Sequence, residues 1–239
     1  QARLFARTVV ISEATRQAAI AQGFGDGALA VIHPGVDVDR ITPAAEPPGP
    51  PGGDGPVVLA YPSRIIPGKG QHLAIEAFER LPSPWKERAE LRIVGAAPDP
   101  AYLESLRARA AGLNVTFHLD VPEIVPFYQT AHLVLFPTMM EEGFGYTAVE
   151  GLACGRPVVH FRCAAVDEAC GGHAVGVPAG DTTAMARAVA ELLDDPRRCR
   201  ELGAAGRRHV VDSYSWDVIW RKYREVLTAA VQSSHGASP

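Results

Sequence analysis

Two glutamates separated by seven residues, Glu142 and Glu150, form the part of this sequence best suited to chemistry. They follow the apolar run Leu133–Phe136 and enclose Gly143-Phe144-Gly145 and Tyr146-Thr147, an order that predicts a strand, a glycine-rich turn and the start of a helix. Free N–H groups at a helix N-terminus, at the carboxyl edge of a sheet, favour an anionic ligand. A carboxylate instead accepts hydrogen bonds from hydroxyl groups. Together these groups favour a nucleotide that carries a sugar, although the spacing alone also arises by chance in ordinary loops.

A second segment places two cations after another strand. The apolar run 57–62 is followed by a Pro/Gly turn that carries Arg64 and Lys69, and then by a helical pattern with apolar residues at 73, 77 and 78. The turn is not a Walker A loop, because Gly70 occupies the position of the Mg-binding hydroxyl. A flat guanidinium fork and a compact ammonium suit a diphosphate, while the alternative is a pair of solvated surface cations.

The rest of the chain alternates between apolar runs and helical patterns. This alternation predicts an α/β protein with a Rossmann-like parallel sheet, helices on both faces and right-handed crossovers. Strands are expected at 57–62, 91–95, 115–119, 133–136, 157–160 and 174–177, with helices over 100–111, 124–131, 182–193, 196–211 and 215–231.

Composition excludes several classes of protein. With 47% hydrophobic residues, the 239-residue chain can build a sizeable core. The net charge of −4 argues against nucleic acid as a general partner. No apolar run approaches the 18 residues that a transmembrane helix needs, so no transmembrane segment is expected.

The four cysteines show no metal-ligand spacing. Cys163, Cys170 and His173 invite a zinc hypothesis, but reduced and mostly buried thiols in a cytoplasmic protein are the preferred interpretation. No bound metal is therefore expected.

Three stretches resemble the donor half of retaining glycosyltransferases of family 4, which have the GT-B architecture of two Rossmann-like domains. The first stretch contains Arg64, Lys69 and Ile75-Glu-Ala-Phe78, the second runs from Phe136 to Gly145, and the third is Val149-Glu-Gly-Leu-Ala-Cys-Gly-Arg-Pro-Val-Val159. The resemblance extends from about Val9 to about Trp220 and implies that this chain is the C-terminal half of a GT-B fold.

The resemblance also implies a domain division. Residues 1–41 are expected to be the end of the N-terminal acceptor domain with the hinge, and 42–56 a Pro/Gly linker. Residues 57–213 would form the nucleotide-sugar binding domain, and 214–239 a C-terminal crossover helix and tail. The rest of the N-terminal domain is expected to be missing from this chain, which would then be inactive alone.

Roles carry over to matching positions. By resemblance, Arg64 and Lys69 would bind the donor diphosphate, and Glu142 with Gly143 and Phe144 would meet the transferred sugar. Backbone N–H groups of Gly145, Tyr146 and Thr147 would add to the phosphate contacts, Glu150 would accept from both ribose hydroxyls, and the base would lie near Val121. Arg64, Lys69 and Glu142 are thus the candidate catalytic residues.

Some positions depart from the usual family pattern. Leu119 and Ala96-Ala97 stand where glycine is common, which bears on how closely base and phosphates approach. Phe161 and Arg162 are unusual, whereas Glu168 keeps the usual acidic position.

The expected activity is transfer of a sugar from a nucleotide-sugar donor, of UDP or GDP type, to an unknown acceptor with retention of configuration. This would make the protein a metal-independent hexosyltransferase without a cofactor. Two alternatives stay open: a GT-B epimerase or hydrolase acting on a nucleotide sugar, and a non-catalytic nucleotide-binding module.

Overall fold

The computed structural model describes residues 7–46, 48–49 and 55–235, with side chains described up to 232. Its main feature is a six-stranded sheet of order β5-β4-β3-β6-β7-β8 in which every neighbouring pair is parallel. The strands are β3 (Val57–Pro62), β4 (Ala89–Gly95), β5 (Val115–Leu119), β6 (Leu133–Phe136), β7 (Val158–Phe161) and β8 (Val175–Val177). The predicted parallel α/β sheet is confirmed.

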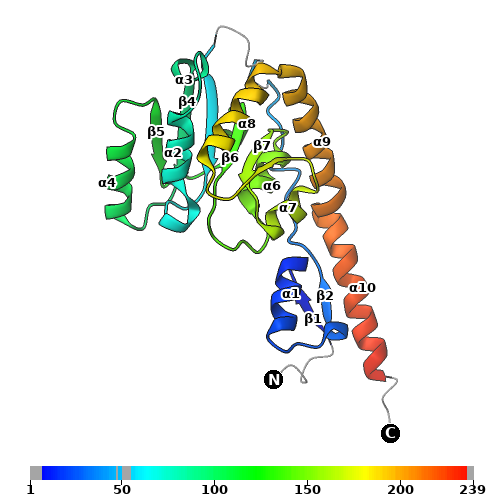
Figure 1. Ribbon diagram of the computed structural model, residues 1–239. Coiled ribbons are helices and arrows are strands. Elements are labelled where there is room, and N and C mark those ends of the chain that lie inside the picture. The colour runs from blue at the N-terminus through cyan, green and yellow to red at the C-terminus, as the bar shows by residue number, and fades with distance from the viewer. Residues whose placement is uncertain (1–6, 47, 50–54, 236–239) are drawn as a thin grey trace.

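Helices cover both faces of this sheet (Figure 1). On one face α2 packs against α4 and α8, and on the other α6 packs against α7 and α9. Strand order runs outward from β3 in both directions, so right-handed crossovers place the two sets of helices on opposite faces. The helices are α2 (Gln71–Glu79), α3 (Trp85–Arg88), α4 (Pro100–Arg109), α5 (Val125–Gln129), α6 (Tyr146–Ala153), α7 (Ala164–Cys170), α8 (Thr182–Asp194) and α9 (Pro196–Tyr214).

Local sequence explains where several helices begin. Asp99, Asp181 and Asp195 each accept a hydrogen bond from the backbone N–H three residues later, which satisfies a donor that a helix start leaves unpaired. Pro100 and Pro196 stand at first-turn positions, where a missing N–H costs nothing.

A smaller unit precedes the main sheet. β1 (Thr8–Val10), α1 (Glu13–Ala21), the short η2 (Asp26–Ala28) and β2 (Leu29–Val31) form a two-stranded parallel β-α-β unit. The last helix, α10 (Trp216–His235), continues in nearly the same direction as α9 and lies alongside this unit (Figure 1). Val36, in the segment after β2, and Ser215, between α9 and α10, form a parallel β-bridge.

One hydrophobic core connects most of these elements. All six residues of β3 are buried, and so are all four of β6 and of β7, as expected for central parallel strands. Ile32, Val36 and Ile41 extend the core towards the small unit, and Ile219 of α10 is fully buried in it. The segment after β2 is therefore packed against the six-stranded sheet and its helices, which are called the main domain below.

The structure differs from the sequence prediction in detail. α3 and α7 were not predicted, since neither carries a long helical pattern, and α9 continues three residues beyond the expected end at 211. The described residues of the expected linker, 42–46, 48–49 and 55–56, form no helix or strand. The other linker residues, 47 and 50–54, lie outside the described part of the chain. So do residues 1–6 and 236–239 of the expected terminal segments. The domain division itself stays a prediction.

Candidate functional site

The turn after β3 presents Lys69 towards the loop after β6. Residues Pro67–Lys69 form a single 3-10 turn (η3), which ends at Gly70 with φ 76°, in the left-handed region. A Cβ at Gly70 would collide with the carbonyl oxygen of Pro137. Glycine therefore permits both the turn and the close approach of the two loops.

Glu142 is held by two side chains. Its Oε1 atom lies 2.6 Å from Nζ of Lys69 and accepts a hydrogen bond of 2.8 Å from the Thr138 hydroxyl. Both charged side chains are mostly buried, with 15% of Lys69 and 13% of Glu142 exposed. Thr138 in turn accepts a bond from the Met140 backbone N–H. This ion pair joins the two loops that the sequence predicted would meet.

Helix α6 begins with an uncapped N-terminus next to these loops. Its N-cap is Gly145, with φ 88° and no side-chain hydrogen bond to the first turn. A Cβ on Gly145 would lie 2.8 Å from Cγ2 of Val166, so a larger residue would strain this junction. The Tyr146 and Thr147 N–H groups thus open the helix without a capping side chain, an arrangement that binds anions.

Glu150 lies one turn into α6 and is held by Tyr128. Its Oε2 atom accepts a hydrogen bond of 2.7 Å from the Tyr128 hydroxyl. Burial raises the pKa of Glu150, while this hydrogen bond acts in the opposite direction. Tyr128 is fully buried, and burial followed by the nearby Glu150 charge raises its own pKa well above the ordinary value. The carboxylate therefore has a fixed position.

A pocket of about 490 Å³ brings several predicted residues together at the carboxyl edge of the sheet. Its lining includes Arg64 and Lys69 from the turn after β3, Thr147 and Glu150 from α6, and Val121 from the loop after β5. Arg64 is exposed, and no hydrogen bond or ion pair ties its side chain to another described residue. The pocket thus contains an available cation together with the partly buried carboxylate of Glu150.

The other predicted residues do not line this pocket. Glu142 and Gly143 lie in the loop after β6, beside Lys69 and Ile11 respectively. Phe144 is 2% exposed and packs edge-on against Tyr146 and Tyr214, so it is a core residue. Tyr146 is 51% exposed.

Two residues at the site were missed from sequence. Tyr128 positions Glu150, and Thr138 positions Glu142. Tyr128 lies at a buried helical position that reads as ordinary core, and Thr138 directly follows Pro137. For Thr138 the available signals were its position after a strand on the ligand-binding edge and its place in the stretch 136–145 that resembles the glycosyltransferase family.

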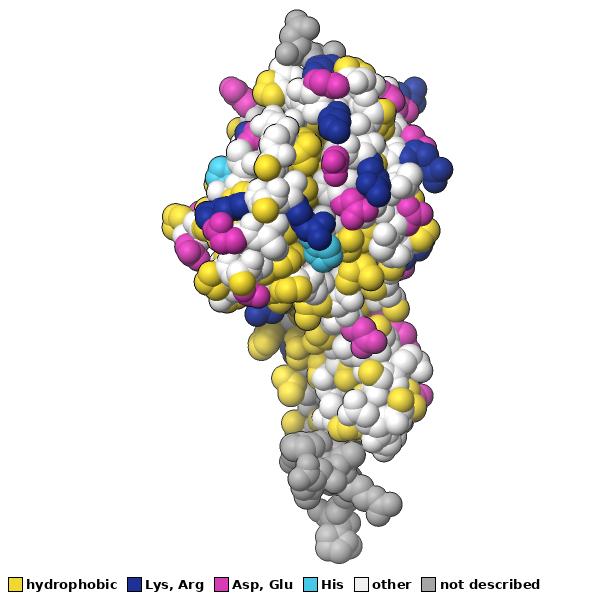
Figure 2. Space-filling view, turned by 60° about the vertical axis from the view of Figure 1, so that its left-hand side comes forward, with side chains coloured by type: hydrophobic (Ala, Val, Ile, Leu, Met, Phe, Trp, Pro, Cys, Tyr) yellow, Lys and Arg dark blue, Asp and Glu magenta, His cyan; other side chains and the backbone are white. Residues whose placement is uncertain are grey.

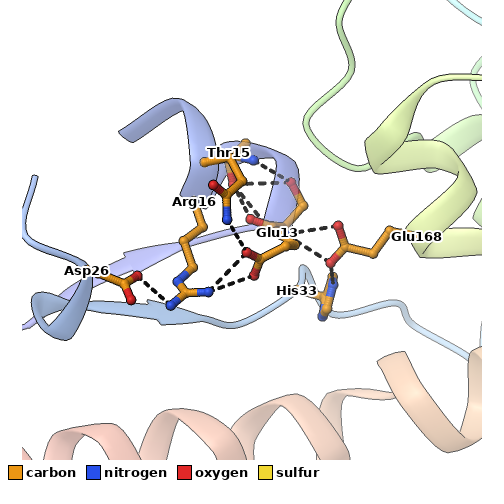
Figure 3. A network of polar contacts seen from close by, with 8 residues as sticks. Glu13, Thr15, Arg16, Asp26, His33 and Glu168 are labelled. Atoms are coloured by element: carbon orange, nitrogen blue, oxygen red, sulfur yellow. Dashed lines mark hydrogen bonds and ion pairs between the residues drawn. The ribbon is translucent and has the colours of Figure 1, made fainter. Parts of the chain in front are cut away.

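Glu168 links the small unit to the main domain (Figure 3). Its two carboxylate oxygens accept hydrogen bonds of 3.0 and 2.9 Å from the Glu13 N–H at the start of α1, and Oε1 lies 2.7 Å from Nε2 of His33. Arg16 forms ion pairs with Glu13 and Asp26 in the same network. α7 therefore holds α1 and the end of β2 through one side chain.

Apolar side chains border the site. Figure 2 shows charged side chains of both signs mixed over the larger upper part of the molecule, with hydrophobic side chains gathered where it meets the smaller lower part. Met139 and Met140, in the loop after β6, are 53% and 38% exposed, and Ile11 after β1 is 39% exposed. Apolar surface thus lies close to the polar pocket.

This fold, a parallel α/β sheet with a pocket at its carboxyl edge, matches one half of the GT-B fold. It superposes on the crystal structure of Anabaena HepE in complex with UDP, with a TM-score of 0.84 over 94% of this chain and 64% of that chain, at 21% identity. The chain belongs to the family Glycosyl transferases group 1, whose model matches residues 56–195.

Curated relatives agree with this assignment. The chain is 33% identical, over 87% of its length, to a GDP-mannose-dependent phosphatidylinositol monomannoside mannosyltransferase of Mycolicibacterium smegmatis, and spans 58% of that protein. It is 28% identical, over 97% of its length, to the glycogen synthase of Mycobacterium tuberculosis, and spans 56% of it. The chain therefore spans little more than half the length of these relatives. Among the described residues, no helix is both long and apolar enough to cross a bilayer.

Proposed function

We propose that this chain is the donor-binding half of a retaining glycosyltransferase that transfers a hexose from a nucleotide sugar to an acceptor. The observation that carries the proposal is the carboxyl-edge pocket, which is lined by Arg64 and Lys69 together with the partly buried Glu150. Membership of the glycosyltransferase family supports the reaction class.

In this proposal the two cations and α6 bind the diphosphate. Arg64 supplies a planar donor fork, Lys69 a point charge, and the first turn of α6 backbone N–H groups. Negative charge on the diphosphate grows as the bond to the sugar breaks, so these donors stabilise the transition state more than the ground state. Lys69 and Arg64 are therefore the proposed catalytic cations.

The carboxylates bind hydroxyl groups. Glu150, fixed by Tyr128, accepts from the two ribose hydroxyls, while the base lies beside Val121. Glu142, with the turn Gly143–Phe144, meets hydroxyls of the transferred sugar. Because Glu142 is paired with Lys69 in the structure, a bound diphosphate shares this cation with the carboxylate.

The proposed mechanism uses neither a metal nor another cofactor. The leaving phosphate takes the proton from the acceptor hydroxyl on the same face of the sugar, which gives retention without a protein nucleophile. The donor is of UDP or GDP type, since one relative is described as GDP-mannose-dependent and one structural neighbour contains UDP.

The acceptor site is proposed to lie on the part of the relatives that this chain does not span. α10 carries large apolar side chains that are mostly exposed: Trp216, Trp220 and Leu227 are 55–60% exposed. We propose that the remainder of the N-terminal domain covers these side chains, and that the chain alone is inactive. The four cysteines are free, and this supports the proposed cytoplasmic location.

Product analysis tests the activity. The full-length enzyme, incubated with UDP- and GDP-hexoses and candidate hydroxyl acceptors, should give a glycoside whose anomeric configuration by NMR matches that of the donor. An inverted product would refute the proposed stereochemistry. Free hexose at the same rate with and without acceptor would favour a hydrolase, and a changed sugar still attached to nucleotide would favour an epimerase.

A further inference from the structure

A second cavity, of about 630 Å³, lies at the opposite edge of the main sheet. Its lining includes His132 and Pro157, which directly precede β6 and β7, and Pro196 at the start of α9. Because all six strands are parallel, their amino ends share one edge and the proposed donor pocket occupies the other (Figure 1). The two cavities have no lining residue in common.

The lining of this cavity combines apolar groups with positive charge. Three arginines, Arg156, Arg200 and Arg207, contribute to it together with His132, and none of its described lining residues is acidic. Arg207 is already engaged, since it donates to the carbonyl oxygens of Val38, Ile41 and Ala153. Arg200 is exposed, so it lies at the rim.

Arg156 is the unusual member of this group. It is only 7% exposed, and its Nε atom is buried without a hydrogen-bond partner. Among the described residues, no carboxylate forms an ion pair with its guanidinium group. Burial lowers its pKa. A buried charge without a counter-ion is costly, and buried charges in native proteins are normally paired.

We propose that this cavity binds an oxyanion attached to an apolar group, with a phosphate or carboxylate against Arg156 and the apolar part along the surrounding prolines. A guanidinium fork matches either anion, and a bound anion would supply a partner that Arg156 does not find among the described residues. Arg200 at the rim adds a second cation. The volume suits a small organic ligand, and an apolar lining with few polar groups is typical of such sites.

Calorimetry with hexyl phosphate tests this site in the 239-residue chain, with hexanoate and hexanol as matched ligands. Hexyl phosphate should bind with one-to-one stoichiometry, more tightly than hexanoate, and hexanol should not bind measurably. Arg156→Met should weaken binding at least about tenfold and Arg200→Ala several-fold, because each loses a charge-assisted hydrogen bond. Lys69→Ala, in the opposite pocket, should leave the affinity unchanged.

Thermal unfolding without ligand supplies the second readout. Arg156→Met removes a buried charge that has no counter-ion in the described part of the chain, so the melting temperature of the variant should equal or exceed that of the parent. A lower melting temperature would assign Arg156 a structural role and overturn the proposal. The proposal would also be overturned if neither hexyl phosphate nor hexanoate bound the parent chain. Unchanged affinity for hexyl phosphate in both Arg156→Met and Arg200→Ala would overturn it as well.

Discussion

The Lys69 ammonium and the Glu142 carboxylate lie 2.6 Å apart, at the meeting point of two loops that follow different strands. Each group is mostly buried, so water screens their attraction only weakly. Removing either partner leaves the other charge unpaired. Substitutions here therefore report on both the loop geometry and the proposed chemistry.

Lys69→Ala and Arg64→Ala should mainly lower kcat of the full-length enzyme. Charge on the leaving diphosphate grows in the transition state, and loss of one preorganised contact typically costs on the order of 10²–10³ in rate. Steady-state kinetics with varied donor measures the effect. A raised KM with unchanged kcat would show that these cations bind ground and transition states equally, contrary to the proposed role.

Thr138→Val should lower kcat about tenfold, because the hydrogen bond that fixes Glu142 Oε1 is lost while side-chain volume is kept. Thr138→Ser is the matched control, since it keeps the hydroxyl and should retain most activity. Equal rates for the valine and serine variants would mean that this hydrogen bond does not position Glu142 for catalysis.

Glu150→Gln should raise the melting temperature at neutral pH. Burial raises the pKa of Glu150 above the ordinary 4.5, so the folded protein holds this proton more tightly than the unfolded chain does. Its ionisation therefore costs stability as pH rises from the ordinary pKa through the raised one.

Melting curves of both proteins from acidic to neutral pH measure this difference. It should shrink as pH falls and disappear where Glu150 is protonated in both states. A variant that is less stable than the parent at neutral pH would contradict the predicted sign.

At the scale of elements, Glu168 on α7 accepts the Glu13 N–H, a donor that the start of α1 would otherwise leave unpaired, while Ser12 accepts the N–H of Thr15. The carboxylate also lies at the positive end of the α1 dipole. α1 is thus capped by one residue of its own unit and one of the main domain.

Glu168→Ala should make the backbone amides of α1 exchange with solvent faster, because the Glu13 N–H and His33 lose their acceptor. The free energy of local opening of α1 should fall by about 1–3 kcal/mol. Hydrogen exchange of residues 13–21 measures this change. Asp181→Ala is the matched control, since Asp181 caps α8 and its loss should affect that helix. Unchanged exchange of α1 in Glu168→Ala would show that Glu168 does not hold this unit.

Elements with long apolar runs or helical periodicity were predictable from sequence, because one chain segment carries the whole signal. The elements of this kind include the fully buried strands β3, β6 and β7 and the helices α8 and α9. α3 and α7 are short and depend on their tertiary surroundings.

The same reasoning applies to the site. Parallel topology was enough to predict that Arg64 and Lys69 would lie near the loop after β6. Which side chains pair across elements depends on geometry that no single segment contains. The contacts of Lys69 with Glu142, of Tyr128 with Glu150 and of Glu168 with α1 were therefore found only in the structure.

At the scale of the whole molecule, the residues proposed to bind the nucleotide-sugar donor all belong to the main domain. They lie between Arg64, in the turn after β3, and Glu150 on α6. α10 lies alongside the small unit and exposes Trp216, Trp220 and Leu227. The acceptor site is proposed to lie on the part of the relatives that this chain does not span. Donor binding is therefore expected of the chain by itself.

Isothermal titration calorimetry of the 239-residue chain with UDP and GDP, in the presence of EDTA, tests this claim most directly. At least one nucleotide should bind with one-to-one stoichiometry, and Glu150→Ala should weaken that binding by at least about tenfold through loss of the ribose contacts. Hexyl phosphate in excess should not displace the nucleotide. Absence of heat for both nucleotides with a chain shown to be folded, or equal affinity in Glu150→Ala, would contradict the donor-site assignment.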